Sequence, residues 1–137
     1  MANDFSVSVD VAVPASAAWG LVGDPGRVHE WFGPVASTTI VGDGRHAVMG
    51  NGAELVERLV DRDDAARRYS YTVLAGIPGL TSHRATISVD EIPSGSPVSW
   101  RQTATPVDPE YDIESRVRVA MTRGLEQLRE QLEAAER

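Results

Sequence analysis

Apolar and polar residues alternate strictly at the start of the chain. Apolar side chains at positions 5, 7, 9 and 11 are separated by Ser6, Ser8 and Asp10, a period of two that is typical of a β-strand with one buried face. The Ala-rich stretch 15–22 then predicts a short helix opened by Pro14, because proline is tolerated in a first turn. Asp24-Pro25 repeats this signal and predicts a second short helix over 27–32, with Asp24 as its N-cap.

Six further strands are predicted in the middle of the chain. Clusters of Gly, Asn, Asp and Pro divide this segment at 42–44, 50–52, 61–64, 76–79 and 93–97, and such clusters mark turns. The strands between them cover about 35–42, 45–49, 53–60, 67–75, 81–92 and 97–105. Asn51-Gly52 is the sharpest turn, since both residues accept a positive φ. The short connections predict an antiparallel meander.

The hydrophobic period changes to that of a helix after Asp108, a predicted N-cap followed by Pro109. Roughly 26 residues at ~1.5 Å each predict a helix about 40 Å long, longer than any of the strands, so the helix is expected to lie across the sheet. One apolar stripe of this helix contains Ile113, Val117, Ala120, Met121, Gly124, Leu128 and Leu132.

These elements predict an α+β fold. A seven-stranded antiparallel sheet is expected to curl around the long C-terminal helix, with two short helices after the first strand. A curled sheet cannot touch the helix along its whole length, so a cavity is predicted between the two layers.

Composition narrows the possible functions. The 137 residues predict one domain, 1–137. The absence of cysteine excludes a disulfide scaffold, thiolate zinc sites, iron–sulfur clusters and a cysteine nucleophile. A net charge of −7 argues against nucleic acid as a partner, because phosphate binding needs a concentrated positive surface. The chain has neither signal-peptide features at its start nor an apolar membrane segment, so a cytoplasmic protein without integral membrane association is expected.

Motifs for metal or cofactor chemistry are missing from the sequence. The three histidines, His29, His46 and His83, come from separate predicted elements and lack metal-ligand spacing. There is no Gly-rich phosphate loop, nucleophile elbow or metalloprotease helix. Neither a metal site nor a cofactor is therefore expected.

Glu57 is the first candidate for chemistry at the predicted cavity. It shares an apolar strand face with Leu55 and Leu59, where a carboxylate is costly without a partner. Near tyrosine hydroxyls or an imidazole it is a candidate general acid or base. The alternative is a structural role, with a hydrogen bond or an ion pair to Arg68 or Arg84 at the cavity rim.

Two tyrosines and one histidine are further candidates on inward strand faces. Tyr69 and Tyr71 lie two residues apart, so both phenols can point into one pocket and hold a ligand oxygen; the alternative is core packing. His83 shares a face with Ala85 and Ile87, which makes it a candidate for proton transfer or simply a polar residue in the wall.

The remaining candidates are mostly large apolar side chains. Trp31, Phe32 and Met49 are placed at the entrance as a lid, with core packing as the alternative. Trp100 shares a face with Val98, Gln102 and Ala104 and is expected to lie deep against the long helix, where Met121 faces the cavity. Gly124 lies on the inward stripe, where glycine costs about 1 kcal/mol relative to alanine. Space for a ligand or for a facing aromatic ring explains it.

The order of these segments resembles the START-like superfamily, also called helix-grip or birch-pollen-allergen-like. Within it, the chain is similar to the bacterial polyketide cyclase/dehydrase and lipid-transport group, often abbreviated SRPBCC, from about residue 5 to residue 132. The resemblance rests on Pro14 with Ala17-Ala18-Trp19, Asp24, Glu30-Trp31, Glu57-Arg58-Leu59, Arg68-Tyr69-Ser70-Tyr71, Ile77-Pro78, Val98-Ser99-Trp100 and Gly124-Leu125 with Leu128.

Three functions are consistent with these features. The first is a binding module whose cavity takes up a small, largely hydrophobic ligand, with Glu57, Tyr69, Tyr71 and His83 fixing its polar groups. The second is an enzyme of the polyketide cyclase/dehydrase type, in which the same cavity orients a poly-carbonyl chain and His83 or Glu57 moves protons. The third is an interaction protein that pairs through a sheet edge or its long helix, although the charged outer face of that helix offers no large apolar patch.

Overall fold

The computed structural model describes residues 3–77 and 79–135 and confirms the α+β fold. Pro78 in the predicted turn, and residues 1, 2, 136 and 137 of the predicted domain, lie outside the described residues. The elements are β1 (Asn3–Val11), α1 (Ala15–Val22), η1 (Pro25–Arg27), α2 (Val28–Trp31), β2 (Val35–Val41), β3 (Gly44–Met49), β4 (Glu54–Asp63), β5 (Arg68–Ala75), β6 (Leu80–Val89), β7 (Ser96–Pro106) and α3 (Ile113–Ala135).

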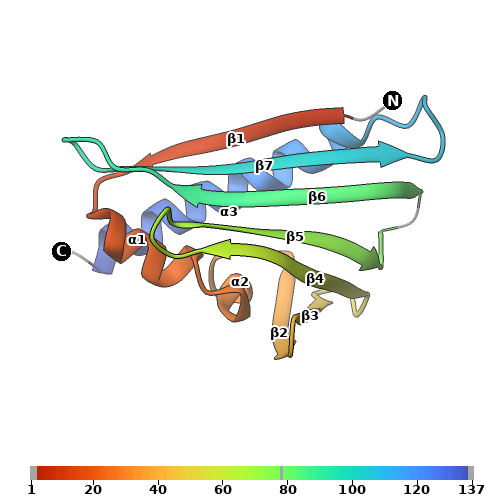
Figure 1. Ribbon diagram of the computed structural model, residues 1–137, viewed down its shortest axis with the longest axis horizontal. Coiled ribbons are helices and arrows are strands. Elements are labelled where there is room, and N and C mark those ends of the chain that lie inside the picture. The colour runs from red at the N-terminus through yellow and green to blue at the C-terminus, as the bar shows by residue number, and fades with distance from the viewer. Residues whose placement is uncertain (1–2, 78, 136–137) are drawn as a thin grey trace.

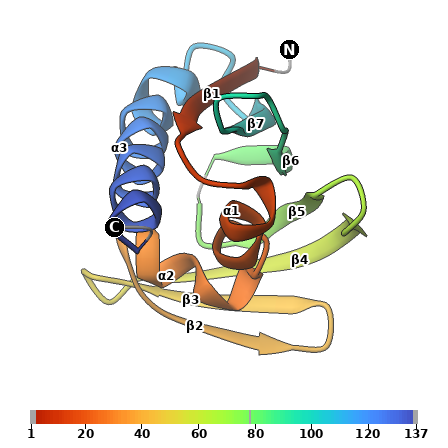
Figure 2. The same cartoon turned by 90° about the vertical axis from the view of Figure 1, so that its left-hand side faces the viewer.

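The strands form one antiparallel sheet in the order β1-β7-β6-β5-β4-β3-β2. Strands β2 to β7 are the predicted meander, and β1 joins it at β7, with Val7 opposite Trp100. Figure 1 shows α3 on one face of this sheet. The end-on view in Figure 2 shows the sheet curving from β1 round to β2, with α3 along the open side and α1 at one end. The predicted curl around the helix is confirmed.

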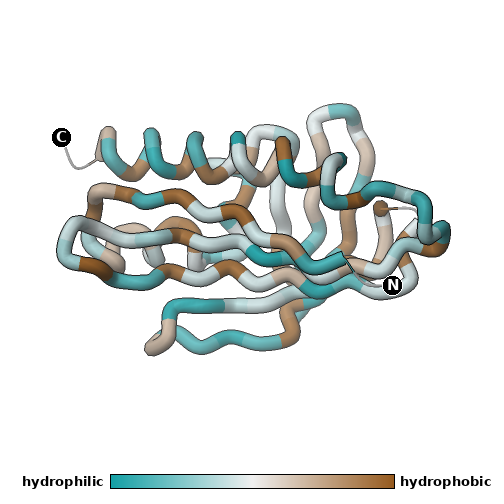
Figure 3. Tube along the Cα trace, turned by 90° about the horizontal axis from the view of Figure 1, so that it is seen from above, coloured by the Kyte–Doolittle hydropathy of each residue, from teal (hydrophilic) through white to brown (hydrophobic). Residues whose placement is uncertain are grey.

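Alternation along the strands separates the core from the outer face. On β7, Val98, Trp100, Gln102 and Ala104 are all buried, whereas the residues between them are exposed or half-buried. Figure 3 shows the corresponding alternation of hydrophobic and hydrophilic residues along the strands and around α3. Because one side of each central strand is mostly apolar, the sheet buries that side against α3 and the short helices.

The long helix starts later than the sequence predicts. It begins at Ile113, and the carboxylate of Asp112 accepts a hydrogen bond from the Ser115 backbone N–H, which is the geometry of an N-cap. The predicted cap, Asp108, instead accepts from the backbone N–H of Glu110 in a local turn. Both aspartates carry a helix-start signal, and the turn at Asp108 satisfies its carboxylate before the helix begins.

Two turns also differ from their predicted positions. β4 continues to Asp63, because Asp61 and Asp63 pair with Ser70 and Arg68, and the chain reverses at residues 64–67. At the same end of the sheet, where the Val89 backbone N–H donates to the Arg67 carbonyl, β6 stops at Val89 instead of continuing to Ile92, which forms a separate bridge with Gly95. Cross-strand pairing thus overrides the weak strand propensity of aspartate.

The sheet is irregular where β5 passes the cavity. Val56 lies opposite Ala75 but Glu57 lies opposite Val73, so Leu74 is an extra residue in β5, as in a β-bulge. On its other side, β5 pairs with β6 only from Arg68 to Tyr71. The two strands therefore separate beyond Tyr71, and side chains rather than a continuous ladder connect them there.

Candidate ligand-binding cavity

A cavity of about 250 Å³ lies between the sheet, α2 and the first half of α3. An apolar cavity of about 150 Å³ accommodates benzene, so this one has room for a molecule of one or two rings. Its apolar wall contains Val28, Phe32, Pro34, Val35, Ala47, Met49, Leu55, Val73, Ile77, Trp100, Val117, Ala120 and Met121. Polar side chains in the wall are Arg45, Glu57, Tyr71, His83 and Gln102, with Glu54 and Arg116 exposed at the rim.

An ion pair between Arg45 and Glu57 forms the polar end of the cavity. The two residues lie opposite each other on β3 and β4, and the Nε of Arg45 donates a hydrogen bond to Oε1 of Glu57 at 2.8 Å. Both are buried, with 3% and 4% of their surface exposed. Two buried charges of opposite sign that face each other compensate much of the cost of removing them from water.

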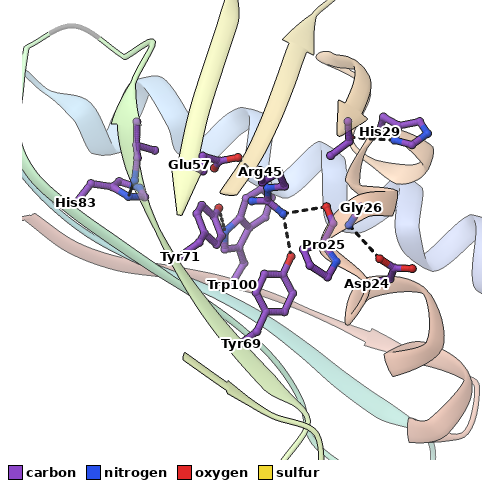
Figure 4. A network of polar contacts seen from close by, with 12 residues as sticks. Asp24, Pro25, Gly26, His29, Arg45, Glu57, Tyr69, Tyr71, His83 and Trp100 are labelled. Carbon is purple, nitrogen blue, oxygen red and sulfur yellow. Dashed lines mark hydrogen bonds and ion pairs between the residues drawn. The ribbon is translucent and has the colours of Figure 1, made fainter. Parts of the chain in front are cut away.

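Arg45 also connects the cavity to the short helices (Figure 4). Its Nη1 donates to the Tyr69 hydroxyl at 3.2 Å and to the Pro25 carbonyl at 3.3 Å. The guanidinium lies 4.5 Å from the centre of the Tyr71 ring, a cation–π distance. Burial alone would lower the pKa of Arg45, but the Tyr69 phenol and the Glu57 carboxylate raise it. Arg45 therefore remains a fixed positive charge.

Two polar groups at this end of the cavity, one in the ion pair and one next to it, can still form hydrogen bonds with a ligand. Within the described part of the chain, only Arg45 donates to Glu57, through Oε1, so Oε2 is free to accept. The Tyr71 hydroxyl accepts from Nε1 of Trp100 at 3.1 Å, but its own proton has no acceptor among the same residues. Burial, reinforced by the charge of Glu57, raises the pKa of Tyr71, so the phenol stays protonated and remains a donor.

His83 bridges the gap where β5 and β6 separate. Its Nδ1 accepts the backbone N–H of Val73 at 3.1 Å, and its Nε2 lies 3.0 Å from Oε1 of Gln102. Because Nδ1 is an acceptor, the proton of a neutral imidazole must be on Nε2, which then donates to Gln102. The amide of Gln102 in turn donates to the sulfur of Met121. Every polar position of the His83 ring is thus in use.

Burial lowers the pKa of His83, although the hydrogen bond that its Nε2 donates to Gln102 acts in the opposite direction. The neutral ring fits the observed contacts, since a proton on Nδ1 would face the Val73 N–H. His83 therefore acts in this geometry as a neutral brace between β5 and β7. It has no free nitrogen for proton transfer to a ligand.

Aromatic side chains pack the junction between α2, β7 and α3. The ring of Trp100 lies 5.3 Å from that of Phe32 and 5.6 Å from that of Trp31, both in edge-to-face arrangements. A Cβ at Gly124 would be 2.6 Å from Cδ1 of Phe32. Of the two predicted reasons for a glycine here, the facing aromatic ring applies.

The structure brings seven of the ten predicted ligand-binding residues together in the cavity wall: Phe32, Met49, Glu57, Tyr71, His83, Trp100 and Met121. Three others lie outside it. Trp31 is fully buried behind Phe32, which does not fit a place in an entrance lid. Tyr69 is on the far side of Arg45, where it lines a separate depression with Pro25 and Leu59. Gly124 lies beneath the Phe32 ring.

Sequence reasoning missed Arg45 and assigned Glu57 the wrong alternative partners. Arg68 and Arg84 are exposed on the outer face of the sheet, so neither pairs with Glu57. The alternation of β3 contained a signal for Arg45, because Arg45 shares its strand face with Ala47 and Met49. Across the described residues, no group of three or more His, Asp or Glu side chains is arranged to hold a metal ion.

Comparisons with known proteins agree with this fold. A family model described as polyketide cyclase/dehydrase and lipid transport matches residues 2–133. No curated protein matches the sequence. Along residues 3–77 and 79–135, none of the helices is both long and apolar enough to cross a membrane.

Several solved structures share the fold along almost the whole chain. Protein XoxI from Bacillus cereus is 26% identical with a TM-score of 0.88, and 98% of each chain is covered. A protein from Thermobifida fusca is 35% identical with a TM-score of 0.78, over 94% of this chain and 92% of that one. The Zhui aromatase/cyclase from a Streptomyces species is 17% identical with a TM-score of 0.84, over 100% of this chain and 97% of that one.

Proposed function

Because the chain belongs to the polyketide cyclase/dehydrase and lipid transport family, we propose that it binds a small, largely hydrophobic molecule in the cavity between the curved sheet and α3. One observation carries this proposal. The inner wall is apolar and partly open, yet it contains a buried polar end where Glu57 and Tyr71 retain hydrogen-bonding capacity. A few placed polar groups in an apolar hollow are typical of small-molecule sites.

Ligand size follows from the volume. About 250 Å³ accepts one or two rings or a short chain, and longer molecules would extend past Glu54 and Arg116 at the rim. The half-buried state of Val117 and Ala120, on the inward side of α3, supports this proposal, since both residues line the hollow.

The enzyme alternative has less support from the geometry. The Zhui protein is named an aromatase/cyclase, and proton transfer by Glu57 or His83 would be the corresponding chemistry in this chain. However, the two nitrogens of His83 are engaged with Val73 and Gln102, and Glu57 is paired with Arg45. A pocket that holds its polar groups in this way favours binding over acid–base catalysis.

Calorimetric titration with naphthalene tests the proposal. We expect saturable binding to the wild type with one site per chain. Ala120→Phe should abolish this binding, because Ala120 lines the cavity and a ring there would occupy the ligand's space. Val119→Phe is the matched control, since the neighbouring side chain is 55% exposed on the outside of α3. Equal binding by all three proteins, or by none, would contradict the proposal.

A further inference from the structure

The polar end of the cavity restricts which hydrophobic molecules fit. We propose that the site selects ligands with a neutral hydroxyl group, placed against Glu57 and Tyr71, and that it rejects carboxylates of the same shape. This inference rests on the proposed function and specifies the ligand class of the same cavity. The Arg45–Glu57 ion pair sets this selectivity, because the charge of Arg45 is already neutralised by Glu57.

The buried charged groups of the cavity wall already neutralise each other. The charged groups in the wall are Arg45 and Glu57 inside and Glu54 and Arg116 at the exposed rim. The inner pair is already neutral as a unit, with its charges 2.8 Å apart. His83 is held as the uncharged ring by Val73 and Gln102. An additional charge on a ligand would therefore enter a buried site without a counter-charge, which is costly.

The polar end of the cavity offers a ligand one hydrogen-bond acceptor and one hydrogen-bond donor. Among the described residues, Oε2 of Glu57 lacks a donor and the hydroxyl proton of Tyr71 lacks an acceptor. Both side chains contact the Arg45 guanidinium, Glu57 through a hydrogen bond and Tyr71 through the face of its ring (Figure 4). A ligand hydroxyl can donate to the first and accept from the second. A ketone can only accept, so it would leave the Glu57 oxygen without a donor.

A carboxylate is the poorest match. It cannot donate to Glu57, and it would need to share the guanidinium of Arg45 with the existing carboxylate. The Nε of Arg45 is committed to Glu57 and its Nη1 to Tyr69 and the Pro25 carbonyl, and these contacts fix the position of the guanidinium. Two carboxylates a few ångströms apart in a buried site repel each other strongly.

Three probes with one ring system separate these contributions: 2-naphthol, 2-naphthoate and naphthalene, titrated calorimetrically at neutral pH. We expect the wild type to bind 2-naphthol about threefold to tenfold more tightly than naphthalene, for one satisfied pair of hydrogen bonds. We expect 2-naphthoate to bind at least about tenfold more weakly than 2-naphthol, because of like-charge repulsion.

Glu57→Gln should reverse the preference. The amide oxygen can still accept from Arg45, but the guanidinium is left without a counter-charge, so 2-naphthoate should then bind more tightly than 2-naphthol. Tyr71→Phe leaves the ion pair intact. It should reduce the advantage of 2-naphthol over naphthalene and keep the rejection of 2-naphthoate. Circular dichroism checks the folding of both variants, and Tyr71→Phe carries the test if Glu57→Gln does not fold.

The outcomes distinguish the two proposals. If the wild type binds none of the three probes, the proposed function is contradicted. If it binds naphthalene but binds 2-naphthoate as tightly as 2-naphthol, the cavity is a ligand site and the selectivity inferred here is wrong. An unchanged order of preference in folded Glu57→Gln would also overturn the role of the Arg45–Glu57 ion pair.

Discussion

A buried charge is tolerated in this protein because its partner is positioned across a strand pair. Arg45 and Glu57 meet opposite each other on β3 and β4, and both are buried. Removal of one partner therefore leaves the other without compensation, whereas removal of both leaves an apolar wall. The pair is expected to contribute more to the specificity of the cavity than to stability.

Arg45→Met should lower the free energy of unfolding by about 3–5 kcal/mol. The double variant Arg45→Met with Glu57→Leu should recover most of this loss. Chemical denaturation monitored by circular dichroism measures both. Arg101→Met is the control, because Arg101 and Asp4 form an ion pair on the surface. Loss of a surface ion pair changes the free energy of unfolding only slightly. If Arg45→Met were as mild as this control, the buried pair would not have the role assigned to it.

His83 gives the protein a predictable response to acid. Burial lowers its pKa in the folded state, so the unfolded chain takes up this proton at a higher pH than the folded one. Above the usual histidine pKa of about 6.5 the difference has no effect on stability. As the pH falls from there through the lower pKa of the folded state, stability is lost.

His83→Gln should therefore lose less stability than the wild type when the pH is lowered from 7 to 5, as measured by thermal unfolding at each pH. His46→Gln is the matched control, because the His46 side chain is 44% exposed. A pH dependence that is identical in the wild type and His83→Gln would contradict the account of His83 as a neutral brace.

The sequence predicted which strand face each site residue lies on more reliably than it predicted the residues that each one contacts. Period-two alternation correctly placed Glu57, Tyr71 and His83 on inward faces, because side-chain direction is a local property of a strand. Partners depend on register, which a single strand does not specify. The pairing of Arg45 with Glu57, and the contact of His83 with Val73 across a broken ladder, therefore appear only in the folded sheet.

At the scale of elements, α3 accommodates the short helices through a single glycine. The ring of Phe32, which follows α2, lies where a side chain of residue 124 would be. The sequence flagged Gly124 as unfavourable in a helix and offered two explanations. The structure supports the aromatic ring: Gly124 leaves room for Phe32, which lines the cavity, and is not itself among the lining residues.

Gly124→Ala and Gly20→Ala form a matched pair. Gly20 lies in α1, where a Cβ would meet nothing within 4 Å, so Gly20→Ala should stabilise the protein by about 0.5–1 kcal/mol. Gly124→Ala should destabilise it despite the same gain in helix propensity, because Phe32 must move. Denaturant titration of both variants measures the difference, and stabilisation by Gly124→Ala would contradict the packing described.

Element boundaries were predicted less well than element types. The helix over 113–135 and the strand over 54–63 were both identified, but their ends differ from the predictions near Asp108 and Asp61. An aspartate can cap a helix or stabilise a turn, so its presence alone does not fix an element's end. At Asp108 a local turn forms, and at Asp61 strand pairing continues. Such competition between local signals is settled by tertiary contacts.

At the scale of the whole molecule, the hollow follows from curvature and from one irregular strand. The sequence predicted that a curled sheet would leave space beside a long helix. The extra residue Leu74 and the early end of the β5–β6 pairing determine where that space widens. The volume of the cavity and its polar end depend on these irregularities, which the alternation pattern does not encode.

The most direct test of the account is a crystal structure of the protein grown with 2-bromonaphthalene, in which anomalous scattering locates the bromine. We expect one site between the sheet and α3, within contact distance of Phe32, Trp100 and Met121. A cavity closed by these side chains, with bromine elsewhere on the protein or absent, would contradict the claim that this fold encloses a binding site.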